Sequence, residues 1–369
     1  ASGNTGVGHN SLSANTTGAS NTAFGAGSLD VNTTGASNTA VGLGSLGANT
    51  TASNNTAVGF NSLISNTTGT QQVAVGGLAL DANTTGNYNQ AFGYGALSSN
   101  TTANYNTALG YFALGANTTG STNTALGRSA LTYNTEASNN TAVGEVALFA
   151  NTTGIDNTAV GSGAASAVTT GYFNTMIGSG AGDTLTTGHS NVMVGHQAGD
   201  NNISGFGNTY VGRNTDGSGA HVNNETAIGS SLTGKGDNTG FFGGSSGVYN
   251  QGNTTAWNTT SDRRIKKNIV DNNSGLDALK SIQVRNFEYK TKDEIINDSP
   301  ELKDVVKSAV VETEGVQLGV IAQELEKILP ECVTTASTGV KTVNSDNLTW
   351  YLINAVKELS TKVTALEAG

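Results

Sequence analysis

The chain has 369 residues, a formal net charge of −10, 50 glycines, two prolines and one cysteine. The single Cys332 excludes an intrachain disulfide, and no hydrophobic stretch reaches the roughly 18 to 20 residues that span a bilayer. We therefore expect no membrane insertion, and we expect stability to come from packing or from association between chains. Because the chain starts at Ala1 inside a repeat and without a signal-like segment, we also expect it to be part of something longer.

Charge divides the chain near residue 260. The first 260 residues hold three basic residues, ten acidic residues and 45 of the 50 glycines, whereas the last 109 hold the other 14 basic and 17 acidic residues and both prolines. A proline-free run of this length suits a structure whose backbone N–H groups form ladders. The sequence therefore predicts a shaft over 1–243, a linker over 244–260 and a second domain over 261–369.

A 17-residue repeat fills the first of these regions. The glycine of an Asn-Thr-Ala-Val-Gly motif recurs every 17 residues from Gly8 to Gly229, and the next similar glycine, Gly243, comes 14 residues later. Two apolar rows keep the same period, one beginning Val7, Phe24, Val41 and the other Leu12, Leu29, Leu46. At about 3.3 Å per residue, each coil has room for two or three short strands. The period predicts a mainly β fold, a parallel β-solenoid of fourteen coils with Asn side chains bonding one another at the corners.

The expected core of each coil is thin. One Val, one Leu and two Ala per repeat bury a narrow seam, which at about 25 cal/mol per Å² gives little to offset the ordering entropy of 17 residues. Association of several chains along the rod would close this deficit. A monomeric solenoid with a thin core is the alternative.

The sequence patterns of the second domain predict an α+β fold. Alternation in "VRNFEYK" (284–290) predicts a strand, "GVIAQELEKIL" (319–329) predicts a helix that stops at Pro330, and a final helix is expected to begin near Ser345. That last helix carries apolar residues at spacings of four and three: Leu352, Val356, Leu359, Val363 and Leu366. This heptad seam predicts a coiled coil between copies of the chain, and packing of the helix on its own domain is the alternative.

Three blocks of the second domain occur in a fixed order: "SDRRIKKNI" from Ser261, "LGVIAQELEKILPECV" from Leu318 to Val333, and "LTWYLINAVKELSTKVTALE" near the end. Together they resemble the C-terminal intramolecular chaperone and auto-processing domain of phage tailspikes and tail fibres, the endosialidase type. The repeat array also resembles the shafts of phage tail fibres and, more loosely, the head repeats of trimeric bacterial adhesins. The resemblance implies a homotrimer whose C-terminal domain helps the β-structured shaft to fold and, in many members, then cuts itself off.

Matched to the family motif, Ser261 corresponds to the nucleophile and Lys266 to the general base of a Ser/Lys dyad. A serine hydroxyl is a weak nucleophile until a neighbouring base takes its proton, and a lysine accepts a proton only when its ammonium form is disfavoured. The cations Arg263, Arg264 and Lys267 would disfavour that form by repulsion. From the residues alone, the alternative is that Ser261 caps a turn beside a solvated basic surface.

Three other residues are assigned lesser roles at this site. Asp262 is a catalytic candidate that either orients the lysine or neutralises the basic cluster, and Gln323 and Glu324 are candidates to line the same pocket. We expect no cofactor and no metal, because the four histidines, His9, His189, His196 and His221, lack metal-ligand spacing and are expected at the surface. We expect no nucleic acid at "RRIKK", since the chain is acidic and offers no aromatic platform there.

The sequence therefore predicts a structural viral tail fibre protein that assembles in the host cytoplasm and is carried on the virion. Expected partners are two further copies of the chain, other virion tail proteins, and a host surface receptor such as a glycan. The dyad would make it a self-cleaving serine endopeptidase of single turnover with no activity on external substrates. A ligand-binding repeat adhesin or an ice-binding solenoid without proteolysis is the competing class, although pairs such as Thr16-Thr17 would offer one outward Thr per coil.

Overall fold

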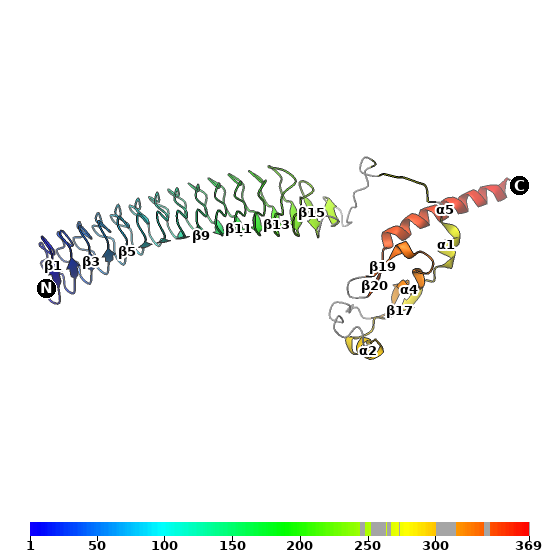
Figure 1. Ribbon diagram of the computed structural model, residues 1–369, viewed down its shortest axis with the longest axis horizontal. Helices are drawn as coiled ribbons and strands as arrows, with labels where there is room; N and C mark the ends of the chain where they lie inside the picture. Colours follow the sequence, from blue (N-terminus) through cyan, green and yellow to red (C-terminus); the bar gives the residue numbers. More distant parts are fainter. Residues whose placement is uncertain are drawn as a thin grey trace. The chain divides into compact units, whose positions relative to one another are not determined.

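The computed structural model describes residues 1–243, 248–251, 263, 267–272, 274–299, 315–335 and 340–368. The chain divides into two compact units, Ala1–Thr260 and Ser261–Gly369, each considered by itself. Figure 1 shows the first unit as a row of stacked coils and the second as short helices and strands beside one long helix.

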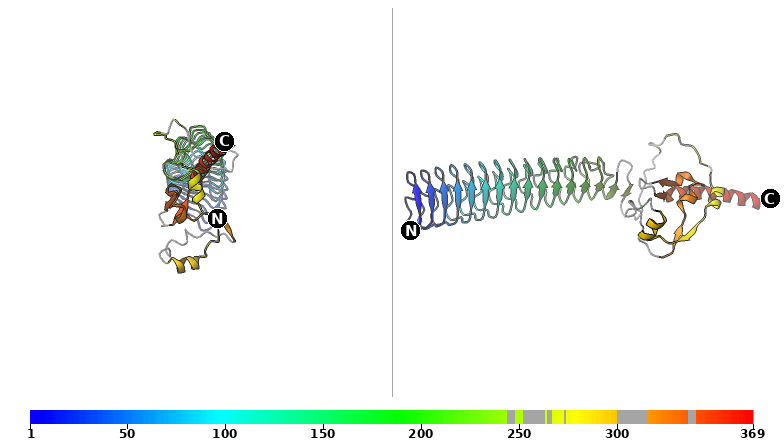
Figure 2. Two further views of the ribbon diagram at one scale, coloured as in Figure 1. Left: turned by 90° about the vertical axis from the view of Figure 1, so that its right-hand side faces the viewer. Right: turned by 60° about the horizontal axis from the view of Figure 1, so that its bottom comes forward.

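The first unit is a parallel β-solenoid with one strand in each 17-residue coil, which confirms the predicted fold class. Each strand pairs in parallel with the next, for example Thr39 with Thr56, and the strands follow one another along the row in Figure 2. The fourteen strands are β1 Thr5–Val7, β2 Thr22–Phe24, β3 Thr39–Val41, β4 Thr56–Val58, β5 Val73–Val75, β6 Gln90–Phe92, β7 Thr107–Leu109, β8 Thr124–Leu126, β9 Thr141–Val143, β10 Thr158–Val160, β11 Thr175–Ile177, β12 Val192–Val194, β13 Thr209–Val211 and β14 Thr226–Ile228.

The sheet continues past the last full repeat. β15 Thr239–Phe242 pairs in parallel with β14 after a coil of 14 residues, and β16 Val248–Gln251 pairs antiparallel with β15. The expectation of two or three strands per coil is wrong for the described residues, where the remaining sides of each coil are turns and one isolated bridge, Asp216 with Thr233. The turns still bond from coil to coil, so each coil keeps its backbone partners without forming a second strand.

Each strand from β2 to β14 turns its middle residue inward. In β4, Ala57 is fully buried, whereas Thr56 and Val58 on either side are partly exposed. The expectation that one Val per coil joins the core is therefore wrong, because successive side chains of a strand point to opposite faces and the Ala takes the inner position. The core consists mainly of Ala and Leu, and the row that includes Leu63 is fully buried from Leu29 to Leu148.

The buried leucines lie where the backbone turns sharply. Leu46 and Leu63 both have φ of 51°, a left-handed conformation that costs an L-residue about 1 to 2 kcal/mol. Each is held there by the next coil, as when the Leu46 N–H donates to the Ser62 carbonyl at 3.0 Å. The corner after each strand needs glycine, because a Cβ on Gly42 (φ +134°) would collide with the carbonyl of Gly59 one coil away.

Two rows of buried asparagines connect the coils, as expected. In one row, the Asn38 N–H donates to Asn21 Oδ1 at 3.0 Å and its amide donates to the Ala52 carbonyl at 2.8 Å. In the other, the Asn49 amide donates to Asn32 Oδ1 at 2.8 Å. Buried amides with their partners in place impose little net cost, whereas an unpaired one would cost about 1 to 3 kcal/mol. These hydrogen-bonded rows hold successive coils together, which in other folds a wider apolar core does.

Three aspartates interrupt this neutral pattern near the end of the shaft. Asp183, Asp200 and Asp216 lie in successive coils, and the Asp216 carboxylate accepts the Asp200 N–H at 2.7 Å. Burial, followed by a side-chain hydrogen bond to Asp200 and repulsion from Asp200 and Asp216, raises the pKa of Asp183 to about 7. Burial also raises the pKa of Asp216. The column is therefore expected to hold a proton that the unfolded chain would release.

We expect the shaft to lose stability as the pH rises from about 4 to about 7. The folded chain keeps the Asp183 proton up to about pH 7, whereas the unfolded carboxyl releases it near 3.8, so the folded state binds more protons in this window. Because Asp183 is partly exposed and solvent screens its charge, Asp183→Asn should stabilise the shaft by only about 1 to 2 kcal/mol at pH 8, and by less at pH 5. Chemical denaturation at both pH values checks this. Asp156→Asn, outside the column, is the control, and an unchanged pH dependence in Asp183→Asn would contradict the assignment.

The described residues of the second unit form two small antiparallel pairs and several helices. Its elements are α1 Leu276–Ser281, β17 Arg285–Phe287, α2 Lys292–Asp298, β18 Gln317–Gly319, α4 Ala322–Leu325, η3 Pro330–Cys332, β19 Val333–Thr335, β20 Lys341–Val343 and α5 Ser345–Glu367. β17 pairs with β18, and β19 pairs with β20. The core gathers Leu325, Leu329, Cys332 and Tyr351.

The predicted elements of this unit are present with different lengths. The strand in 284–290 and the final helix from Ser345 are confirmed. The helix expected over 319–329 is limited to the four residues of α4, because Gly319 is the last residue of β18 and pairs with Arg285. None of the helices among the described residues combines the length and the hydrophobicity needed to cross a membrane.

Candidate functional site

The long helix α5 uses one side to pack on its own unit. Tyr351 and Ala355 are buried on that side, and the Glu358 carboxylate accepts the Leu276 N–H of α1 at 3.1 Å. Gly275 permits the close approach, because a Cβ there would lie 2.8 Å from the backbone nitrogen of Ala355. These contacts fix which side of α5 faces α1.

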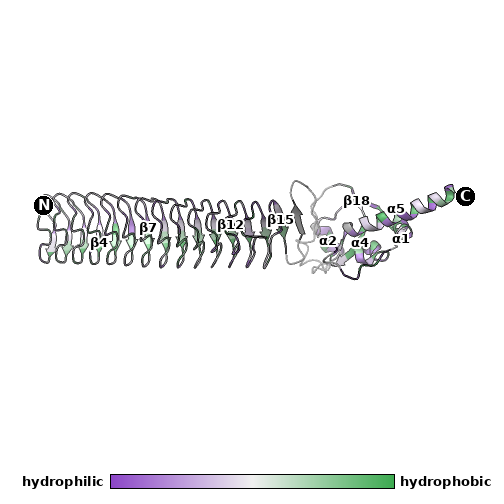
Figure 3. Ribbon diagram, turned by 90° about the horizontal axis from the view of Figure 1, so that it is seen from above, coloured by the Kyte–Doolittle hydropathy of each residue, from purple (hydrophilic) through white to green (hydrophobic). Residues whose placement is uncertain are grey.

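The heptad seam lies on a neighbouring side of α5 and is exposed. Val356 is 58% and Leu366 82% exposed, and the other three seam residues, Leu352, Leu359 and Val363, are exposed as well. Figure 3 shows hydrophobic and hydrophilic residues alternating along α5. Since other residues attach α5 to its unit, the seam is not what holds the helix to its own domain.

The start of α5 is anchored through the preceding segment. The Asn344 side chain caps the helix by accepting the Asn347 N–H at 3.2 Å. The Tyr351 hydroxyl donates to the Glu331 carboxylate, a contact that lowers the pKa of Glu331 and raises the pKa of Tyr351. Cys332 next to it is a core residue, and its burial raises the pKa of its thiol.

Glu324, a predicted pocket residue, is already paired. Arg285 of β17 donates to its carboxylate through Nε at 3.2 Å and Nη2 at 3.0 Å. This side-chain hydrogen bond and the attraction of the opposite charge raise the pKa of Arg285. This bidentate ion pair joins α4 to β17. Gln323, next to Glu324 in α4, is exposed.

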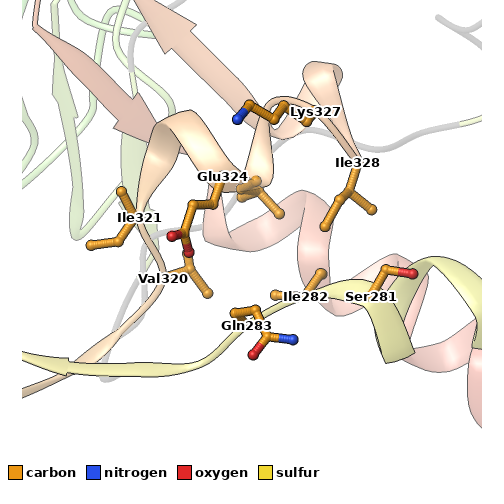
Figure 4. A pocket seen from close by; sticks show the side chains of 9 residues that line it. Ser281, Ile282, Gln283, Val320, Ile321, Glu324, Lys327 and Ile328 are labelled. Atoms are coloured by element: carbon orange, nitrogen blue, oxygen red, sulfur yellow. The ribbon is translucent and has the colours of Figure 1, made fainter.

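A cavity of about 220 Å³ lies under α4. Its wall is largely apolar, with Ile282, Val320 and Ile328 among the lining residues, and Glu324 reaches over Val320 in Figure 4. The cavity also has a hydroxyl and an amine, those of Ser281 and Lys327, but the two groups point away from each other in Figure 4. The Ser281 hydroxyl donates to the Asp277 carbonyl of its own helix at 3.0 Å. The cavity therefore does not form a Ser/Lys dyad.

The predicted catalytic residues Ser261, Asp262 and Lys266 lie outside the described residues, so the dyad stays a prediction. Of the cations around it, Arg263 and Lys267 are described and both are exposed.

The histidines of the shaft do not cluster. His189 lies between Tyr172 and Phe206, with ring centroids 4.6 and 5.1 Å apart, and the other three are exposed. Within the part of the chain that the structure describes, no three His, Cys, Asp or Glu residues come together in a way that could hold a metal ion.

Residues 261–334 match the family model described as the chaperone of endosialidase. The match begins at Ser261 and includes the first two of the three sequence blocks. It follows directly on the unit that contains the solenoid, and it confirms the resemblance drawn from the sequence. No curated protein and no solved structure matches the chain.

Proposed function

We propose that this chain is the shaft and the C-terminal folding chaperone of a homotrimeric phage tail fibre or tailspike, carried on the virion and used for host attachment. The observation that carries the proposal is the order of its parts: a solenoid shaft followed by a segment that matches the chaperone of endosialidase. Such an arrangement fits a tail fibre or tailspike. Other virion tail proteins and a host receptor such as a glycan would be its partners, and it would assemble in the host cytoplasm.

Trimerisation is supported by the exposed seam of α5. Five apolar residues at heptad spacing lie on a helix whose attachment to its own unit uses other residues. Beside the start of the seam, Leu352 and Leu348 line an apolar hollow with Leu279, Val284 and Val320. Helices from two more copies would cover both surfaces.

We expect Val356→Asp combined with Leu359→Asp to convert the trimer to monomers at micromolar concentration. Each substitution would bury an unpaired carboxylate in the coiled coil, at a cost of about 3 kcal/mol or more. Thr361→Asp with Thr364→Asp is the matched control, because it adds two carboxylates at the same spacing on exposed positions outside the seam. Sedimentation velocity of the full chain measures the outcome. A double seam variant that stays trimeric would remove the coiled coil from the proposal.

The chaperone's physical task would be registration of the three shafts. Fourteen strands of nearly identical sequence could align one coil out of step at little cost, and a C-terminal trimer that forms first would fix the register. Self-cleavage would then separate the chaperone from a shaft that is kinetically trapped.

For self-cleavage, we propose that the neutral amine of Lys266 takes the proton of the Ser261 hydroxyl. The serine oxygen then attacks a backbone carbonyl carbon, the C–N bond breaks, the departing nitrogen takes up a proton, and water hydrolyses the ester that remains. The bond is either Ser261-Asp262, which the resemblance favours and where attack of the serine on its own carbonyl leaves a four-membered lactone, or Thr260-Ser261, where an acyl shift leaves the Thr260 acyl group on the serine oxygen and frees the Ser261 amine. The start of the family match at Ser261 supports this place in the chain.

The geometry does not favour an ice-binding surface. In the Thr-Thr pairs, the Thr33 hydroxyl donates to the Thr50 carbonyl at 3.0 Å and only Thr34 is exposed. Along the strands, the outward third residue varies between Val, Leu, Ile and Phe, so that face is not uniformly flat. Thermal hysteresis of the purified protein tests this alternative directly, and we expect none.

A further inference from the structure

A row of apolar side chains, each at least partly exposed, runs along the strands of the shaft. The shaft has 22 large apolar residues that are exposed, and eight of them are first or third residues of β1–β14. The others lie elsewhere on the coil. We call the outward first and third residues of β1–β14 the Thr–Val face. Its third-residue row is Val7, Phe24, Val41, Val58, Val75, Phe92, Leu109, Leu126, Val143, Val160, Ile177, Val194, Val211 and Ile228.

The Thr–Val face carries no charge in any of its fourteen coils. Its first-residue row is Thr except for Val73, Gln90 and Val192, all uncharged. Charges lie in other rows: Arg128 and Glu145 form an ion pair between successive coils just beyond the strands, and Asp30 and Asp81 lie after the Leu row. An apolar, at least partly exposed row that continues along the whole rod with no charge in it marks an interaction surface.

The dimensions of the Thr–Val face suit a protein interface. Fourteen coils at about 4.8 Å make a strip roughly 65 Å long, and with a width of about 10 to 12 Å it covers roughly 650 to 780 Å². A stable interface buries about 800 Å² on each partner, and the strip comes close to this as the total that one chain would bury against two other copies. The partner must therefore be long, straight, uncharged on the matching side and repetitive at the same spacing, and a second copy of this chain has all four properties.

We infer that the Thr–Val faces of three copies pack against one another along a common axis, an inference that rests on the proposed trimer. Flat sheets facing an axis close into a three-sided prism, in which the outward Val, Leu, Ile and Phe side chains fill the centre. This arrangement supplies the apolar burial that the narrow Ala and Leu core of one coil lacks. Thr51 and its equivalents, which are exposed and lie outside the strands, stay in water.

Cysteine crosslinking of the full chain tests which side faces the axis. Val58→Cys places a thiol on the Thr–Val face, and Thr51→Cys is the matched control in the same part of the shaft on an exposed position. Cys332 is buried and common to both proteins. With a short bismaleimide, we expect at least five times more covalently joined chains in Val58→Cys than in Thr51→Cys. Val75→Cys, one coil further, is a second variant in case Val58→Cys folds poorly.

The outcomes separate this inference from the proposed function. A protein that is trimeric by sedimentation but crosslinks through Thr51→Cys, through neither position, or equally through both, overturns the assignment of the face and leaves the trimer standing. A protein that sediments as a monomer overturns the proposed trimer itself. Trimers that crosslink through Val58→Cys and Val75→Cys but not through Thr51→Cys support both.

Discussion

A chain synthesised without residues 261–369 should yield a shaft that is aggregated or misregistered, with at least tenfold less soluble trimer than the full chain gives. The reason is that the coils from Leu29 to Leu148 bury the same Ala, Leu and bonded Asn, so little in this part of the shaft distinguishes one register of three chains from the next. Removal of the same residues after assembly should leave the shaft folded, because the trapped state no longer needs the chaperone.

The comparison uses two proteins that both finally consist of the shaft alone, without residues 261–369. One is translated only to Thr260, and the other is the full chain with a protease site inserted after Thr260 and cut once it has folded. Gel filtration and circular dichroism of both measure yield and structure. Equal yields of soluble, trimeric shaft would refute the chaperone role, whereas loss of structure after the late cut would refute kinetic trapping.

Self-cleavage is expected at the junction at Ser261. The wild-type protein should cut itself into fragments of roughly 260 and 109 residues without added protease, and only after trimer assembly has created the environment that disfavours the lysine ammonium. Ser261→Ala should abolish cleavage while leaving assembly intact, since the hydroxyl supplies chemistry and little packing. Lys266→Arg should abolish it too, because a guanidinium stays protonated and cannot accept a proton.

Lys267→Arg is the matched control for the lysine, because it makes the same chemical change one residue along at an exposed side chain. A time course of intact mass for the four proteins decides the assignment. If Lys266→Arg still cleaves at the wild-type rate, the dyad is wrong. If the wild-type trimer stays intact after prolonged incubation, this chain is a chaperone without the protease.

The sequence predicted the shaft well because its signal is periodic. One glycine every 17 residues determines the coil, and every coil then repeats the same parallel pairing, as between Thr39 and Thr56. The period alone did not show which residues face inward. That depends on the alternation within a strand of three residues, which puts Ala57 inside and Val58 outside, and on the left-handed turn at Leu63 that carries the leucines into the core.

The second unit was harder to predict because its organising contacts join distant residues. Arg285 and Glu324 are 39 residues apart, and nothing in either local segment marks them as partners. The capping box at Thr291, which starts α2, was a local signal that could have been found from its Thr-x-x-Glu pattern, in which Glu294 caps in return. For the dyad, the sequence motif and the family match remain the support, since Ser261 and Lys266 lie outside the described residues.

The bonding pattern of the shaft also affects how such a protein can change over generations. Each asparagine amide reaches only the adjacent coils, and each strand pairs only with the strands before and after it. Loss or duplication of 17 residues therefore rejoins equivalent partners and alters the rod by about 4.8 Å, whereas an insertion within the repeats that is not a multiple of 17 puts both asparagine rows out of step. Recombination between near-identical repeats can thus lengthen or shorten the fibre in whole coils, and selection on its length acts through discrete steps.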